Sequence, residues 1–276
     1  ALGPPEAQRL LLALHDKVAD AVEEVVQVPH AAVHAVGALE WIGVRSGQVR
    51  TLAVGPYYQP SVSPDGRRIA VERVEGAGRS NIWMVDAATG AAERWTHDPA
   101  INTTPVWSPA GDSVIFSSNR SGSVAMYVRD TGGSLAERTV FSPPHAMIMW
   151  PNEWRPGNLV SFDRFEPGTG YNTYEMRDGE AVPIARTAAM EMRGVISPDL
   201  RWFAYDSDVS GRRQLYFVDR RTSERYVLPV EGAMRPRWAR SAPKLFFHTT
   251  GNEFFEMTVV PGRPPTAWPV RRLFST

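Results

Sequence analysis

The sequence predicts an all-β protein, a β-propeller of six blades with five as the alternative, in which each blade is a four-stranded antiparallel sheet. The first observation is an internal repeat with five copies: a proline, an aromatic or aliphatic residue, Ser-Pro, a small turn and an alternating apolar run, with Ser-Pro replaced in the third and fifth copies. The copies are 42 to 47 residues apart, a period typical of propeller blades. The second observation is that each copy contains four short strand signals, and so small a sheet buries both faces only by stacking on further copies. The anchors of the five copies are Pro64, Pro109, Pro156, Pro198 and Arg240.

The clearest copy runs from Gln59 to Thr96. Its first strand ends at Ser63-Pro64-Asp65-Gly66, where proline fixes φ and glycine supplies the positive φ of a tight turn. We expect the same turn at Ser108-Pro109-Ala110-Gly111 and at Ser197-Pro198-Asp199-Leu200. The apolar residues that follow these turns predict one equivalent strand position in three copies, occupied by Ile69, Ile115 and Phe203. The other strands of the clearest copy are predicted at Arg68–Val71, Ser80–Asp86 and Glu93–Thr96.

Two strands and an N-terminal α-helix are predicted before the first copy. Ala38–Val44 and Gln48–Val54 read as strands, which supplies half of a further blade and favours six blades over five. Glu6–Val26 reads as an amphipathic helix that packs on the propeller, with a dimer-forming helix or a connector to an upstream domain as the alternatives. The predicted division is 1–36 for the helix and connector and 37–276 for the propeller. The apolar stripe of the helix consists of Leu11, Leu14, Val18, Ala21 and Val25.

The repeat also carries a resemblance to a known family. The order P-x-W-S-P-D-G-x-x-I-x-F-x-S, then I-W/Y-x-x-D, then L/W-T, resembles the TolB-like β-propeller repeat of bacterial periplasmic TolB, which also occurs in sensor regions of some bacterial serine/threonine kinases. The likeness covers residues 37–274 and departs from the family pattern at Arg155-Pro156-Gly157 and at Arg240-Ser241-Ala242. It implies a scaffold, a sensor or an accessory domain of a hydrolase, in a periplasmic or other extracytoplasmic location.

Composition narrows the class of function. The 276 residues are 43% hydrophobic and 22% charged, which suffices for one large core. Thirty basic and thirty acidic residues balance each other, so the basic surface expected of a nucleic-acid-binding protein is missing. The chain has no cysteine, which excludes disulfides and thiolate metal sites. No stretch of the sequence is apolar for long enough to span a membrane.

Loops that lead from one blade into the next are expected at the mouth of the central channel, where binding residues concentrate. Five of the nine methionines fall in these loops, together with aromatic residues, and such side chains form adaptable apolar surfaces. The alternative is that the methionines fill the core between blades and that Glu191 forms an ion pair with Arg193 or Arg235. The predicted ligand-binding or partner-binding residues are Tyr57, Tyr58, Asn102, His145, Met149, Trp150, Glu191, Met192, Arg193, Arg235 and His248.

Catalytic motifs are sparse. The six histidines form no HExxH motif, and the sequence has no G-x-S-x-G elbow, so neither a metal nor a cofactor is predicted. The leading hypothesis is a non-enzymatic propeller that binds a protein, a peptide or a small apolar ligand at its mouth. One alternative is a propeller lyase, cyclase or hydrolase that uses Glu153, Glu191, His145 or His248 in the channel. Another is the sensor region of a larger signalling protein.

Overall fold

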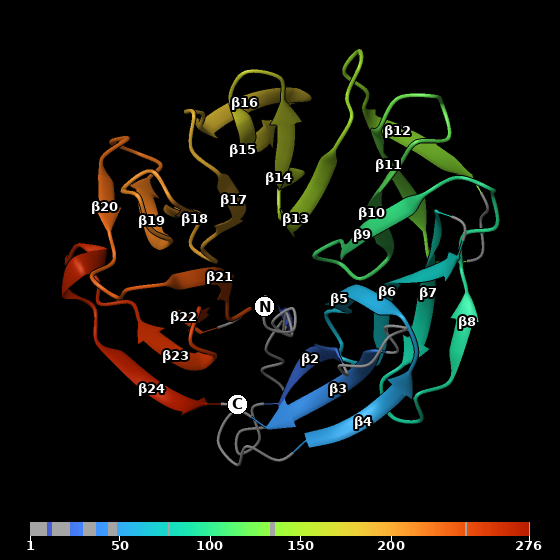
Figure 1. Ribbon diagram of the computed structural model, residues 1–276, viewed down its shortest axis with the longest axis horizontal. Helices are drawn as coiled ribbons and strands as arrows, with labels where there is room; N and C mark the ends of the chain where they lie inside the picture. The colour runs from blue at the N-terminus through green and yellow to red at the C-terminus, as the bar shows by residue number, and fades with distance from the viewer. Residues whose placement is uncertain are drawn as a thin grey trace, which may run out of the picture.

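The computed structural model describes residues 10–12, 23–29, 37–43, 49–76, 78–132, 136–240 and 242–275. The described strands pair into six four-stranded antiparallel sheets, each formed by four consecutive strands. Figure 1 shows these sheets standing like blades around a central axis. The strands are β1 Leu10–Leu12, β2 Glu23–Pro29, β3 Gly37–Gly43, β4 Val49–Val54, β5 Tyr57–Val62, β6 Arg68–Gly76, β7 Arg79–Asp86, β8 Ala92–Arg94, β9 Asn102–Trp107, β10 Ser113–Ser118, β11 Ala125–Asp130, β12 Glu137–Phe141, β13 Met149–Arg155, β14 Leu159–Glu166, β15 Gly170–Arg177, β16 Glu180–Ala185, β17 Glu191–Ile196, β18 Trp202–Ser207, β19 Gln214–Asp219, β20 Arg225–Val227, β21 Ala233–Trp238, β22 Lys244–Thr249, β23 Glu253–Thr258 and β24 Val270–Ser275.

The prediction of an all-β propeller built from four-stranded antiparallel blades is confirmed. The five sheets from β5–β8 to β21–β24 are the five copies of the sequence repeat. The sheet β1–β4 precedes them in the chain. One helical segment, the 3₁₀ helix η1 (Pro265–Ala267), occurs among the described residues, and none of their helices is long and apolar enough to cross a membrane.

The predicted N-terminal helix is wrong. Within Glu6–Val26, Leu10–Leu12 forms β1, and Glu23–Pro29 forms β2, which pairs with both β1 and β3. The three valines of β2 are β-branched residues that favour strands, and the pairing gives β3 and β4 the two further strands of a blade. This tertiary gain outweighs the helical spacing, and the dimer expected through the helix loses its basis. Residues 13–22 of the predicted helix lie outside the described residues, and the predicted boundary at residue 37 separates β2 from β3, two paired strands.

The Ser-Pro turns recur as predicted, because their serines make the same contacts in three blades. Ser63 Oγ accepts the N–H of Arg68 at 2.9 Å, Ser108 Oγ that of Ser113 at 3.1 Å and Ser197 Oγ that of Trp202 at 2.8 Å. One predicted equivalence is wrong by a single residue. The inner strand pairs with Ile69, Val114 and Phe203 at the corresponding register, so Val114 and not Ile115 is the equivalent of the other two. A shift of one residue in a strand moves a side chain to the opposite face, and Ile115 accordingly faces the following blade.

The strands nearest the axis are β5, β9, β13, β17 and β21 (Figure 1). Each has a register shift against the second strand of its own blade. Such a bulge bends the strand and frees a backbone N–H from the sheet. The strand β17 requires a glycine here, since a Cβ on Gly194 would lie 2.2 Å from Thr173 Oγ1. Left-handed φ angles between 48° and 59° occur at three of the other bulges, at Gln59, Thr104 and Arg235, and beside this glycine at Arg193.

Candidate functional site

The bulges of β17 and β21 bring each of these inner strands against a carboxylate of the preceding blade. The N–H of Arg193 donates to Asp163 Oδ2 at 2.7 Å, and the N–H of Arg235 donates to Asp206 Oδ2 at 3.0 Å. Charge-assisted bonds of this kind are among the stronger hydrogen bonds in proteins, so they fix the blades around the axis. The polar residues occupy one equivalent position in five second strands, namely Glu72, Ser117, Asp163, Asp206 and His248, and they pair with or lie beside Tyr58, Thr103, Trp150, Met192 and Met234.

Asp206 is the centre of the largest of these networks. It is fully buried, and its carboxylate accepts hydrogen bonds from Arg193 Nη1 at 3.1 Å and from Arg213 Nη1 at 2.6 Å, in addition to the backbone of Arg235. Burial and the neighbouring Arg193 lower the pKa of Arg235 to about 9. Several cations therefore surround one carboxylate on this side of the axis.

A second charged group lies further along the inner strands. Glu153 on β13 contacts Arg155 Nη2 at 2.6 Å and accepts the N–H of Ile196 from the next blade at 2.5 Å. Arg155 Nε donates to the carbonyl of Ile196 at 2.9 Å. Burial raises the pKa of Glu153 despite the charges of Arg155 and Arg237. These contacts occupy Glu153 in joining two blades.

Three aromatic or apolar residues of the predicted site are buried. Tyr57 packs in the core with Leu39 and Val62, whereas Met149 packs in a different core with Ile115 and Phe162. Met192 is also buried. Tyr57 and Met149 thus lie in two different cores and not on one surface, and Met149 packs in the core as the alternative interpretation of the methionines predicted.

Three more predicted residues belong to buried polar networks. Asn102 is fully buried and accepts a hydrogen bond from Arg120 Nη2 at 2.7 Å. Glu191 accepts the N–H and the hydroxyl of Thr187 at 3.0 and 2.8 Å, whereas Arg193 pairs with Asp206, so the expected bond between Glu191 and Arg193 is replaced by these contacts. His248 Nδ1 lies 3.0 Å from the carbonyl of Thr249, and burial lowers the His248 pKa to about 4.

The residues of the predicted site that retain exposed surface are Tyr58, Trp150, His145 and Arg193. Tyr58 and Trp150 are half-buried on the inner strands β5 and β13, and Trp150 stacks on Tyr171 with ring centroids 5.3 Å apart. His145 lies in the loop before β13 with φ 56°. Three of the four, Tyr58, Trp150 and Arg193, lie near the starts of the inner strands β5, β13 and β17, and we refer to these three residues as the channel mouth.

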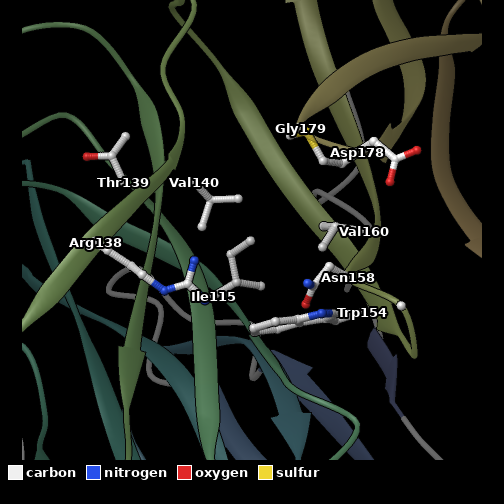
Figure 2. A pocket seen from close by; sticks show the side chains of 11 residues that line it. Ile115, Arg138, Thr139, Val140, Trp154, Asn158, Val160, Asp178 and Gly179 are labelled. Carbon is white, nitrogen blue, oxygen red and sulfur yellow. The ribbon is translucent and has the colours of Figure 1, made fainter.

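A pocket of about 310 Å3 lies elsewhere, between the blades β9–β12 and β13–β16. Its floor is apolar, and Trp154, Arg138 and Asn158 stand around it, as Figure 2 shows. The pocket is bordered by the β13–β14 and β15–β16 turns, which lie at the end of the blade opposite to the channel mouth. The floor consists of Ile115, Val140, Val160 and Met176.

The sequence analysis missed this pocket. Its two signals are a serine, Ser113, where other copies carry Arg68 or Trp202, and the short turn Asp178-Gly179. Both are small features in a degenerate repeat. They leave a pocket only because of how two neighbouring blades pack, and the sequence pattern of a single copy gives no information about that packing.

The histidines and carboxylates named for catalysis have separate partners. Glu153 is bound by Arg155 and Ile196, and Glu191 by Thr187, as described above, while His145 is exposed. Among the described residues no group of three His, Cys, Asp or Glu side chains is arranged to hold a metal.

The fold defines the class of protein, a β-propeller. Residues 41–158 match the family described as TolB beta propeller domain. The predicted resemblance to TolB-like β-propellers is thus confirmed, by this match over part of the chain and by the relatives and solved structures that follow.

Relatives of known sequence match short segments. The chain is 36% identical over 90 residues to the uncharacterized peptidase YuxL of Bacillus subtilis, and 37% identical over 67 residues to the Tol-Pal system protein TolB of Alcanivorax borkumensis. These segments cover 30% and 24% of this chain, and 14% and 15% of the two relatives.

Solved structures share the fold over nearly the whole chain. TolB from Acinetobacter baumannii superposes with a TM-score of 0.69 at 16% identity, covering 96% of this chain and 79% of that one. Putative TolB from Agrobacterium tumefaciens gives a TM-score of 0.68 at 18% identity, covering 86% and 88%.

Proposed function

We propose that this chain is a non-enzymatic TolB-like propeller that binds a protein, a peptide or a small ligand at its channel mouth. The observation that carries the proposal is the placement of Tyr58, Trp150 and Arg193 at the ends of three inner strands, where a rigid ring of blades holds them. Aromatic rings and an arginine beside a rigid scaffold are the side chains that dominate binding energy at protein interfaces. Likeness to TolB supports an extracytoplasmic location.

We further propose that the sheet β1–β4 is a sixth blade that closes the ring. Its first strand, β1, contacts both β21 and β5, and β2 also contacts β5. The sheet therefore lies between the first and the last copies of the repeat (Figure 1). Closure of this kind removes open sheet edges and supports a rigid channel mouth.

A second candidate function is an accessory propeller of a peptidase. It is favoured by the match to a Bacillus subtilis protein named as a peptidase, of which the matched segment covers a small part. In that case the partner at the channel mouth would be a peptide substrate of another domain.

Site-specific photo-crosslinking in the native cell tests the proposal. The full chain carries p-benzoylphenylalanine in place of Tyr58 or of Trp150, and in a control chain in place of Ala110, an exposed residue of the turn after β9. We expect one and the same adduct from the first two positions and its absence from the control, with mass spectrometry identifying a protein partner or a substrate peptide. Adducts that are equal at all three positions, or missing at both mouth positions, would exclude binding at the channel mouth.

A further inference from the structure

Three inner strands carry a tryptophan at the same place. Trp107, Trp154 and Trp238 pair with Val114, Val160 and Leu245, the equivalent residues of the second strands. Trp107 and Trp238 are each 3% exposed, whereas Trp154 is only half-buried. The same side chain is thus covered in two blades and partly open in the third.

The two buried tryptophans are covered by flat groups. The guanidinium of Arg68, from the preceding blade, lies over the ring of Trp107 with 4.7 Å between its carbon and the ring centroid. Trp238 is covered by Trp268, whose ring centroid lies 6.3 Å away. Flat cations and aromatic rings are the groups that an indole face prefers as neighbours.

Trp154 lacks both kinds of cover. The residue of the preceding blade that corresponds to Arg68 is Ser113, since each begins a second strand and pairs with the last aspartate of the third strand. The segment that corresponds to the one carrying Trp268 is the tight turn Asp178-Gly179 between β15 and β16. The pocket of about 310 Å3 occupies the space beside Trp154 that these side chains leave.

Arg138 gives the pocket a charge. It is an exposed residue of β12, and Figure 2 shows its guanidinium directed toward the apolar floor and Trp154. Within the described part of the chain Arg138 has no carboxylate partner, because the adjacent Glu137 pairs with Arg120 and Arg129. The Asp178 carboxylate, which also borders the pocket, points away from Arg138 (Figure 2). A guanidinium fork above an apolar floor suits a carboxylate.

We propose that this pocket binds a small aromatic carboxylate, with its ring against Trp154 and its carboxylate on Arg138. The volume lies at the lower end of the range of small-molecule pockets, which fits one ring with a short acidic arm. Asn158, beside Trp154, offers a further hydrogen-bond donor to the same carboxylate (Figure 2). The site lies away from the channel mouth, so it does not depend on the function proposed above.

Titration of the full chain with phenylacetate tests the inference, followed by the NMR signal of the Trp154 indole N–H and by calorimetry. Phenylacetamide, which has the same ring without the charge, is the matched ligand. We expect phenylacetate to shift the Trp154 signal and to bind about tenfold more tightly than the amide, because a hydrogen bond to a charged group is worth about that factor. Arg138→Gln should remove this preference, whereas Arg212→Gln, at an exposed ion pair in another blade, should leave it unchanged.

A blocking variant provides the structural control. Ser113→Arg places a guanidinium where Arg68 covers Trp107, so it should fill the pocket and abolish binding of both ligands while the protein stays folded. The proposal is overturned if phenylacetate leaves the Trp154 signal unmoved. Equal affinity for the amide, or an unchanged affinity in Arg138→Gln, would show that Arg138 recognises no carboxylate and would equally overturn it.

Discussion

Two interfaces between neighbouring blades differ in how they are filled. Between β17–β20 and β21–β24, Trp268 packs edge-on against Trp202, Phe217 and Trp238 at centroid distances of 5.3 to 6.3 Å. Between β9–β12 and β13–β16 the corresponding positions of the preceding blade hold Ser113 and Val128, and a pocket remains. The two interfaces share one arrangement of strands, but smaller side chains and the shorter β15–β16 turn leave a cavity at one, whereas Trp268 and its neighbours fill the other.

The inner edges of the same two interfaces differ as well. Asp206 binds two arginine side chains and a backbone N–H at the first interface, whereas Ser117 occupies the equivalent position at the second and donates one hydrogen bond to the carbonyl of Met149. The sealed interface is thus held by both packing and charge. The interface with the pocket has fewer packing contacts and fewer charged hydrogen bonds, so a ligand in the pocket could add to its stability.

The largest expected effect on stability comes from replacing a tryptophan at each of the two interfaces. Trp268→Ala should lower the free energy of unfolding by about 3–5 kcal/mol, because it empties a fully packed site. Trp154→Ala should cost roughly 1 kcal/mol, since its half-buried ring loses less than the 1.5–3 kcal/mol of a fully buried side chain. Equilibrium denaturation in urea measures both. Equal losses would mean that the pocket is closed in solution and that the two interfaces are alike.

A smaller effect is expected at the inner edges. Asp206→Asn removes the charge that Arg193 and Arg213 share and should cost about 1.5–3 kcal/mol, whereas Ser117→Ala removes one neutral bond and should cost about 0.5–1.5 kcal/mol. Arg212→Gln breaks an ion pair whose side chains are 59% and 78% exposed, and it should change stability little. A larger loss of unfolding free energy in Ser117→Ala than in Asp206→Asn would contradict the proposed difference between the inner edges of the two interfaces.

The repeat made the fold predictable, and the contacts between repeats made the site hard to predict. Turn residues such as Ser63 and Pro64 act within one copy, so their role could be read from local sequence. The N-terminal helix was mispredicted because β2 is stabilised by β3, a partner distant in sequence. Tyr57 and Met149 were predicted in the loops between blades, but they begin the inner strands β5 and β13, and their pairing with the second strand of the blade is not visible in the local sequence.

The same reasoning explains why the pocket escaped the sequence analysis. Trp154, Ser113 and Gly179 are unremarkable one by one, and they come from two blades. Only a comparison of each residue with its equivalent in another blade shows that Trp154 is left uncovered. Alignment of the copies by the Ser-Pro turn would have shown Ser113 opposite Arg68, but the predicted pairing of Ile115 with Ile69 was displaced by one residue and hid this correspondence.

The smallest expected effect is on the pH dependence of stability. It involves Asp163 and His248, which occupy in two other blades the position of Asp206 and Ser117. Burial raises the pKa of Asp163 from 3.8 to about 6, so the stability linked to this carboxyl is present at low pH and is lost as pH rises through 6. Burial lowers the pKa of His248 from 6.5 to about 4, so its contribution is present above 6.5 and is lost as pH falls through 4. Between pH 4 and pH 6 the two groups change the stability in opposite directions, so together they should change the urea midpoint of the wild type little.

Asp163→Asn leaves only the contribution of His248, so the urea midpoint should fall as the pH is lowered from 6 to 4. His248→Gln leaves only the contribution of Asp163, so the midpoint should rise as the pH is lowered over the same range. Parallel pH profiles for the two variants would show that neither group is buried at the inner edge as its hydrogen bonds indicate, and would remove the distinction drawn between charged and neutral edges.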